Sequence, residues 1–341
     1  MGYHQYFCTI AELDDDLKLR GTEKAAVLLR AVRDASIFLS GKIGEFIPVT
    51  ETRTLPGTGH ARLYVPPLLA VTSITNDDDT LTSVDYILNP RQRHWRNGPY
   101  SWIEADPDST LLAAWHEDRE GVAIAGRWGK YEYSEASGAT VGTGGQTSGA
   151  ATLLADDGSK LSPGMHVLIG SEQELVTGYS TPSTAVTTLN GTITAAQDTI
   201  TLADGTKVKV GEIIRCEWEQ MRVDEIQTHS IAVTRGWNGT VKVAHTTAAN
   251  IDVFRTFTVE RGVNGTTAAA HTAADVIYRY QVPGDVNYLA RQIAALMLKK
   301  ASSGFAGKTG NSELGEVYYT NEFPRGPLAE ISQAYHIPEA G

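Results

Sequence analysis

The sequence contains little cysteine and no long apolar run. Its two cysteines, Cys8 and Cys216, lie far apart in a chain of 341 residues, so no disulfide framework is expected and synthesis in a reducing cytoplasm is favoured. No apolar stretch approaches the roughly 18 residues that span a bilayer, and the first residues lack the basic and apolar regions of a secretion signal. We therefore expect a protein made in the cytoplasm that has no membrane partner.

Positive charge is also scarce. Lys and Arg total 29 against 40 Asp and Glu, which gives a formal net charge of −11. A nucleic-acid binder that neutralises phosphates needs a basic face, so this class is disfavoured. A protein whose acidic surface lines a DNA channel, and repels the DNA so that it slides past, is still possible. Hydrophobic residues make up 41% of the chain, enough for a folded protein of two or three domains.

Recognisable catalytic and metal-binding motifs are missing as well. The segment Ser302–Thr309 is not a phosphate-binding loop, because a serine stands where the motif requires glycine. His116–Glu120 lacks the second histidine of a zinc-protease helix, and Asp77–Asp79 lacks the ligand spacing of a calcium loop. His245 and His271 occupy equivalent repeat positions, which favours packing or turn roles over metal ligation. We expect a protein that is not an enzyme and has no catalytic residues, cofactor or metal.

What the sequence does contain is an internal repeat in an unusual order. The segment Asp157–Val176 recurs without a gap as Asp204–Val223, and Val233–Thr240 recurs as Val259–Thr266. Each of the later segments is followed at the same distance by Ala-His. The order is first half, first half, second half, second half, whereas a tandem repeat would alternate the halves. The simplest explanation is one small β module inserted inside another copy of itself.

Both second halves carry an Asn-Gly pair. Asn-Gly favours a type I′ hairpin turn, because both central residues of that turn need positive φ. We expect structural hairpins here, and the functional alternative is that their arginines project toward a partner. The residues at the expected hairpin tips are Arg235, Trp237, Asn238, Gly239, Arg261, Asn264 and Gly265.

Periodicity predicts how these parts are arranged. Thr9 and Glu12 have capping-box spacing, a second helix extends to residue 43, and helical spacing returns after Pro283. From residue 52 the period changes to two, residues 134–149 resemble a linker, and residues 150–280 are typical of β structure. The expected fold class is α+β, in which a helical domain with a small antiparallel sheet is interrupted by an all-β insertion of two nested homologous modules. The expected boundaries are 1–134 with 282–341 for the discontinuous outer domain, 135–281 for the insertion, 150–182 with 255–281 for the outer module, and 183–254 for the nested module.

Several short segments at the two ends of the chain stand in an order typical of one protein family. They are Ile10–Leu13, Ile43–Phe46, Leu63–Ile74, Asp85–Leu88 and Val122–Tyr131. Their order and spacing resemble the head–tail connector proteins of tailed bacteriophages, also called adaptor or head completion proteins. In that family a Gly-x-Trp-Gly-Tyr-like stretch leads through a proline into a C-terminal helix. In this chain the repeat region is inserted between that stretch and the proline. The resemblance covers roughly residues 5–134 and 282–338.

The resemblance implies a structural virion protein at the head–tail junction, assembled in the host bacterial cytoplasm. Such adaptors form a ring, here a dodecamer, that joins the portal protein to a stopper or tail-terminator protein and extends the DNA channel. Capsid-vertex and neck-decoration proteins are further candidate partners, and genomic DNA would pass through the lumen without sequence-specific binding. In that family the C-terminal segment commonly reaches the portal. The residues that would form this anchor are Val317, Tyr318, Tyr319, Phe323 and Tyr335; the alternative is that these aromatics fold back on their own domain.

A function from a different class stays open. The chain is then a phage neck or tail protein whose β insertion binds a host receptor or glycan. An exposed aromatic at a hairpin tip, such as Trp237, would favour this alternative. A hydrolase with an unrecognised site is a third candidate.

Overall fold

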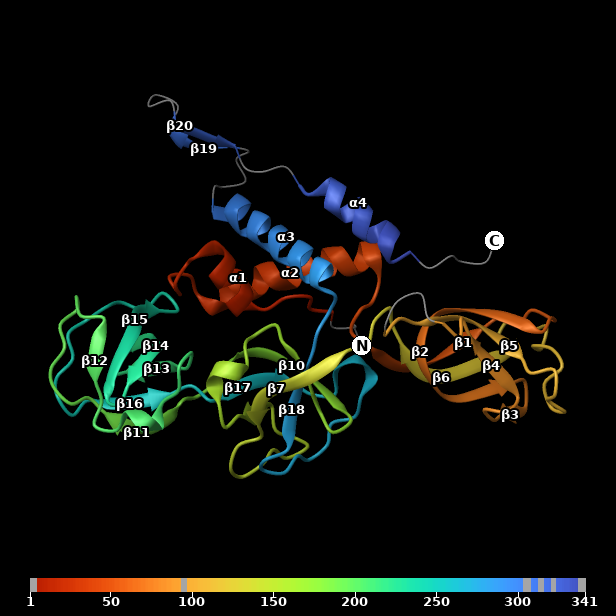
Figure 1. Cartoon of the computed structure of the whole chain (residues 1–341), viewed down its shortest axis with the longest axis horizontal. Coiled ribbons are helices and arrows are strands. Elements are labelled where there is room, and N and C mark those ends of the chain that lie inside the picture. The colour runs from red at the N-terminus through yellow and green to blue at the C-terminus, as the bar shows by residue number, and fades with distance from the viewer. Residues whose placement is uncertain (1–4, 93–96, 303–307, 312–315, 320–322, 337–341) are drawn as a thin grey trace.

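The three β modules of the protein lie in a row, with helices on one side of that row (Figure 1). The computed structural model describes residues 5–92, 97–302, 308–311, 316–319 and 323–336. Over these residues the chain forms three six-stranded antiparallel sheets, one two-stranded ribbon and four α-helices. None of the described helices is long and apolar enough to cross a membrane.

The helices come from both ends of the chain and share one core. They are α1 (Ile10–Leu17), α2 (Ala25–Ile43), α3 (Gly284–Ser302) and α4 (Arg325–Ala334). The predicted capping box is confirmed, because the Thr9 side chain accepts from the Glu12 amide while the Glu12 carboxylate accepts from the Thr9 amide. The apolar stripe of α2 packs on the apolar stripe of α3, as the helical spacing predicts. The buried residues of this core include Leu28, Val32, Ala35, Leu39, Val286, Leu289 and Ile293.

A first sheet follows α2 and has its own core. Its strands are β1 (Val49–Leu55), β2 (Arg62–Asn76), β3 (Asp79–Leu81), β4 (Tyr86–Asn89), β5 (Tyr100–Ala105) and β6 (Val122–Trp128). The order is β1-β6-β2-β5-β4, with β3 paired to β2. Trp115 and Trp128 are among the largest fully buried side chains of this region.

The expected α+β class is therefore wrong in its outer domain. The chain is mostly β, with 21% of it helical, and this conflicts with a helical connector domain that carries only a small sheet. The physical reason lies in β2, a strand of 15 residues whose register shifts let it pair with β5, β6 and β3. The segments with a period of two, expected to form only a small sheet, thus build a six-stranded one.

The outer module and the nested module have the same strand order, position by position. The outer sheet runs β7 (Ser134–Thr140), β18 (Val276–Tyr280), β9 (His166–Ile169), β10 (Glu172–Tyr179), β17 (Thr256–Glu260) and β8 (Thr152–Leu154). The nested sheet runs β11 (Ser183–Thr188), β16 (Asn250–Val253), β13 (Ile213–Cys216), β14 (Glu219–Gln227), β15 (Ser230–Trp237) and β12 (Thr199–Thr201). The chain leaves the outer sheet after β10 and returns to it at β17.

Two further segments differ from what the composition suggests. Residues 134–140 form strand β7, an edge strand of the outer sheet, although their Gly and Ser content is typical of a linker. After α3 the chain forms a ribbon of β19 (Lys308–Asn311) and β20 (Glu316–Tyr319), and then the helix α4, although the aromatics and prolines of residues 317–335 predict a tail more extended than helical.

Candidate functional site

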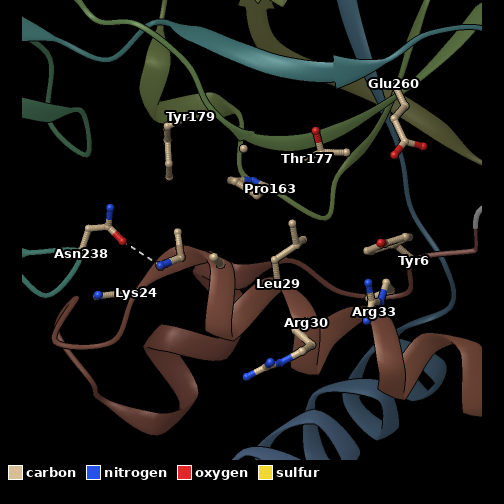
Figure 2. Close-up of a pocket in the computed structure, with 13 residues that line it drawn as sticks. Tyr6, Lys24, Leu29, Arg30, Arg33, Pro163, Thr177, Tyr179, Asn238 and Glu260 are labelled. Carbon is tan, nitrogen blue, oxygen red and sulfur yellow. Dashed lines mark hydrogen bonds between the residues drawn. The ribbon is translucent and has the colours of Figure 1, made fainter. Parts of the chain in front are cut away.

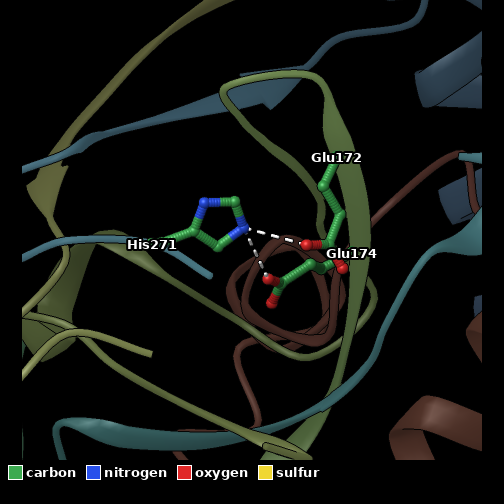
Figure 3. A group of neighbouring side chains, drawn as sticks. All are labelled: Glu172, Glu174 and His271. Atoms are coloured by element: carbon green, nitrogen blue, oxygen red, sulfur yellow. Dashed lines mark hydrogen bonds and ion pairs between the residues drawn. The ribbon is translucent and has the colours of Figure 1, made fainter. Parts of the chain in front are cut away.

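A buried network of charged side chains joins β10 to β17 in the outer module. Arg261 Nε donates to Glu172 Oε1 over 2.7 Å, and Arg261 Nη2 donates to Glu172 Oε2 over 2.7 Å. His271 Nε2 lies 2.9 Å from Glu172 Oε2. Figure 3 shows the His271 ring pointing at the carboxylates of Glu172 and Glu174. Burial opposes ionisation of Glu172, but the hydrogen bonds from Arg261, Ala269, His271 and Gly262 outweigh it and lower the pKa of this carboxyl.

The nested module repeats the contacts of Arg261 and His271 with Glu172. Arg235 Nε and Nη2 donate to the two oxygens of Glu219, each over 2.6 Å, and His245 Nε2 lies 3.0 Å from Glu219 Oε2. Both Arg235 and Glu219 have fully buried side chains. A set of groups that recurs in both copies with its polar atoms satisfied is a structural feature of the module.

The two copies differ at one buried pair. Glu174 and Gln146 of the outer module stand where the nested module has the apolar Met221 and Ile193. Gln146 Nε2 donates to Glu174 Oε2 over 3.2 Å. The other oxygen, Glu174 Oε1, forms an ion pair with Arg261 Nε at 3.0 Å but accepts no hydrogen bond from the described residues. Burial raises the pKa of Glu174 to about 7.

The same residues form a candidate cation site. Glu172, Glu174 and His271 each offer a ligand atom, and these atoms lie within 4.8 Å of one another. However, Arg261 already holds both oxygens of Glu172. When both carboxylates are ionised, they and Arg261 have a net charge of −1. A single proton on Glu174 neutralises this charge, whereas a divalent ion would make the site positive. The donor set therefore fits a protonated hydrogen-bond network better than a metal centre.

Of the residues expected at the hairpin tips, Arg235 and Asn264 are buried, Trp237, Asn238 and Arg261 are half-buried, and the two glycines are exposed. Arg235 and Arg261 do not project toward a partner, because each is held by a buried glutamate of its own module. The predicted positive φ values are found at 57° and 69° for Asn238 and Gly239, and at 54° and 80° for Asn264 and Gly265. The turns are thus confirmed, but the expected hairpins are wrong, because β15 and β17 pair only with strands that precede them in the chain and not with the segments after the turns. The idea of arginines that reach outward is wrong as well.

The nested turn docks on the connection between α1 and α2. Asn238 Oδ1 accepts from the Ala25 amide over 2.7 Å, and the Gly239 amide donates to the Gly21 carbonyl over 3.0 Å. Trp237 packs its ring against Gly21, where a Cβ atom would lie 2.3 Å from the indole, and the Arg222 guanidinium stands 4.8 Å from the ring centre. Trp237 is therefore a contact inside the chain.

The outer turn docks on the first sheet. Asn264 Nδ2 donates to Gln173 Oε1 over 3.1 Å, and Gln173 Nε2 donates to the Pro48 carbonyl over 2.8 Å. Gly265 faces Thr50 so closely that a Cβ atom would lie 1.9 Å from the Thr50 carbonyl oxygen. Both repeated turns thus fix the β modules to the rest of the chain.

The expected C-terminal anchor divides into two parts. Val317, Tyr318 and Tyr319 belong to β20, and their side chains lie outside the described residues. Phe323 packs edge-on against Phe38 of α2, and Tyr335 packs edge-on against Phe46. The Tyr335 hydroxyl also donates to Asp285 over 2.9 Å. Phe323 and Tyr335 thus fold back on the helical core as half-buried residues, which is the alternative given above, and the portal-facing anchor stays a prediction.

A cleft of about 610 Å³ separates α2 from the outer module. Figure 2 shows Leu29 of α2 pointing into it from one side, opposite Thr177 and Tyr179 of β10. Burial raises the pKa of Tyr6, which lines one end, to about 12, so its hydroxyl is neutral. The charged residues of the cleft are Lys24, Arg30, Arg33 and Glu260. Because Arg33 pairs with Asp34, Lys24 and Arg30 exceed Glu260 by one positive charge, and the cleft is weakly basic in an acidic protein.

A further surface is found at the turn between β13 and β14. Glu217 and Trp218 form this turn, and Trp218 is 89% exposed. The outer module has Gly170 and Ser171 at the equivalent turn. Glu217 adopts a φ of 54°, a left-handed conformation that costs a non-glycine residue about 1 kcal/mol. The nested copy thus combines backbone strain with an exposed indole on a scaffold that folds without either.

The surroundings of Trp218 are also more apolar in the nested module than in the outer module. His245 Nδ1 lies 2.8 Å from Glu217 Oε2, and the Val243 amide donates to Glu219 Oε2 over 3.1 Å, so the segment 241–245 runs beside the turn. Val241 is 75% exposed and Val243 40% exposed. The equivalent residues of the outer module are threonine and alanine. Column-by-column comparison of the two copies would have found this apolar surface from sequence alone.

No family model, curated protein or solved structure matches this chain.

Proposed function

We propose that the protein is a structural virion protein, an adaptor that forms a ring between the portal and the stopper or tail of a tailed phage. The proposal does not require a helical connector fold. The observation that carries it is the helical layer, built from both ends of the chain, with exposed apolar residues on its solvent side. Ile37 of α2 is 61% exposed and Tyr288 of α3 is 54% exposed. Such residues suit contacts with neighbouring subunits or the portal.

The buried charges of the β modules support a role that is not enzymatic. Glu172, Glu219 and their arginines are committed to one another, and their histidines contact the same carboxylates. A catalytic acid or base must reach a substrate. These groups instead hold strands together, so the modules serve as rigid building blocks.

The test is co-sedimentation of the purified protein with portal rings from the same phage, followed by electron microscopy. The expected result is a second ring stacked on the portal. Ile37→Glu should weaken this association, because it places a charge on the contact face. Val84→Glu, in the turn between β3 and β4 and at a residue that is 72% exposed, is the matched control. An adaptor role is excluded if the wild-type protein never sediments with the portal.

The exposed Trp218 surface supports a second candidate, in which the nested module binds a host receptor or glycan. An exposed indole can stack on the apolar face of a sugar or fill a pocket on a protein. A glycan array probed with the wild-type protein and with Trp218→Ala separates these functions. Binding that Trp218→Ala abolishes and Ser171→Ala preserves would support the receptor role, whereas an array without signal argues against a glycan.

A further inference from the structure

Opposite charges gather on two separate surfaces of this chain. Lys24 and Arg30 line the α2 cleft, are exposed, and form no ion pair with the described residues, while Arg33 pairs with its neighbour Asp34 on the surface. The second surface is the acidic tip of the first sheet, which we define as Asp77, Asp78, Asp79, Glu117, Asp118 and Glu120. All of these acidic residues are exposed.

The acidic tip is one surface although it comes from two segments. The Asp77 amide donates to the Gly121 carbonyl over 2.7 Å, and His116 Nε2 lies 3.7 Å from Asp77 Oδ2. The turn between β2 and β3 is thereby tied to residues 116–121. Six exposed carboxylates against the single arginine of this segment, Arg119, give the tip a net negative charge that a cationic surface complements.

One copy cannot join its own two surfaces. The cleft is lined by Asn238 of the nested module and by Thr177 and Tyr179 of the outer module, whereas the tip lies on the first sheet. In Figure 1 the nested module and the first sheet occupy opposite ends of the row. A tip that reaches this cleft must therefore belong to another copy.

We propose that the acidic tip of one copy docks in the α2 cleft of the next copy. The contact joins two different surfaces, so it is heterologous and closes into a ring when the rotation between neighbours allows it. A second copy fits better than a nucleic acid, because Lys24 and Arg30 are too few cations to neutralise the successive phosphates of a long polyanion but can pair with a small cluster of carboxylates. This inference rests on the proposed ring and names the surfaces that hold it together.

The test uses charge reversal in the full-length protein, with mass measured by sedimentation velocity at low ionic strength. Wild-type protein should self-associate and dissociate as salt is added. Lys24→Glu/Arg30→Glu should weaken association at least about tenfold, and so should Asp77→Lys/Asp78→Lys. Arg91→Glu/Lys207→Glu changes the net charge as much as the cleft variant does, at exposed positions outside both surfaces, and should associate like the wild type.

Mixing the two reversed proteins gives the decisive measurement. Each variant should be monomeric alone, but the wild-type tip of one complements the wild-type cleft of the other, and the reversed surfaces also complement each other. An equimolar mixture should therefore associate. A monomeric wild type at low salt, a variant that still associates, or a mixture that stays monomeric each overturns the contact, provided that far-UV circular dichroism shows folded variants.

The portal experiment separates this contact from the adaptor role. Charge-reversed variants that form normal rings on the portal would overturn the contact and leave the adaptor role intact. A wild-type protein that self-associates through these surfaces but never binds portal rings would do the opposite.

Discussion

At the residue scale, Glu174 is a buried acid added to a network that works without it. Glu172 and Arg261 balance each other in charge, and the nested module completes the same network with Met221. Burial raises the pKa of Glu174 from 4.5 to about 7. The folded protein thus binds the Glu174 proton more tightly than the unfolded chain does. The stability linked to this proton is fully present below pH 4.5 and is lost as the pH rises through 7.

Glu174→Met should therefore change the pH dependence of stability. The quantity of interest is the free energy of unfolding of the variant minus that of the wild type. This difference should be larger at pH 8 than at pH 4.5, by up to roughly 3 kcal/mol, because only the wild type loses stability as Glu174 ionises. Urea unfolding at the two pH values measures this change. Glu225→Gln, at an exposed glutamate of the nested module, should show no such dependence. A Glu174→Met difference that is equal at both pH values would contradict protonation of Glu174 in the folded protein.

At the scale of the elements, the outer turn is the contact that holds the outer module to the first sheet. Gly265 has a φ of 80° and faces the Thr50 carbonyl with no room for a Cβ atom. Gly170 also has positive φ, 61°, but nothing lies within 4 Å of the position of a Cβ atom. Alanine at Gly170 should cost about 1 kcal/mol of folding free energy, from the left-handed backbone alone.

Gly265→Ala should cost clearly more than Gly170→Ala, because it adds a steric clash at the docking contact. Measured by urea unfolding, the difference between the two variants reports the strength of that contact. Limited proteolysis between residues 128 and 134 should also become faster in Gly265→Ala. Equal stability of the two variants would show that the turn is free to move away from β1.

These elements also show what the sequence could and could not predict. The capping box at Thr9 and the turns at Asn238 and Asn264 depend on neighbouring residues, so local patterns were sufficient. The partner of Arg261 is Glu172, which lies 89 positions earlier, and no local pattern indicates that this arginine is buried. The same holds for Tyr335, which packs on Phe46. The size of the first sheet depends on long-range pairing of β2 with β6, which alternation alone does not reveal.

At the scale of the whole molecule, the nested module is inserted where the ends of its chain lie side by side. Ser183 at its beginning pairs with Val253 at its end, and the Ser180 amide of the outer module donates to the Thr256 carbonyl over 2.9 Å. Closing such a short gap costs little loop entropy. The nested module also has a hydrophobic core of its own, with Leu202, Ile214 and Met221 fully buried. Both parts therefore meet the conditions for folding separately.

Replacing residues 183–253 with a short Gly-Ser turn should leave the rest of the protein folded. β10 and β17 are antiparallel partners that lie far apart in the sequence. After the excision the short turn joins them directly as a hairpin. The losses include the docking of the nested turn on Gly21 and Ala25, the ion pair between Arg255 and Glu212, and the ion pair between Lys209 and Asp157. At about 1 kcal/mol each, such contacts should lower the melting temperature of the remaining protein by at least about 4–8 °C. Thermal unfolding followed by circular dichroism measures this, and a separate 183–253 fragment should show its own cooperative transition. If the excised chain failed to fold, the nested module would be part of the folding unit of the outer sheet, and the duplication would have produced one interdependent domain in place of two separable modules.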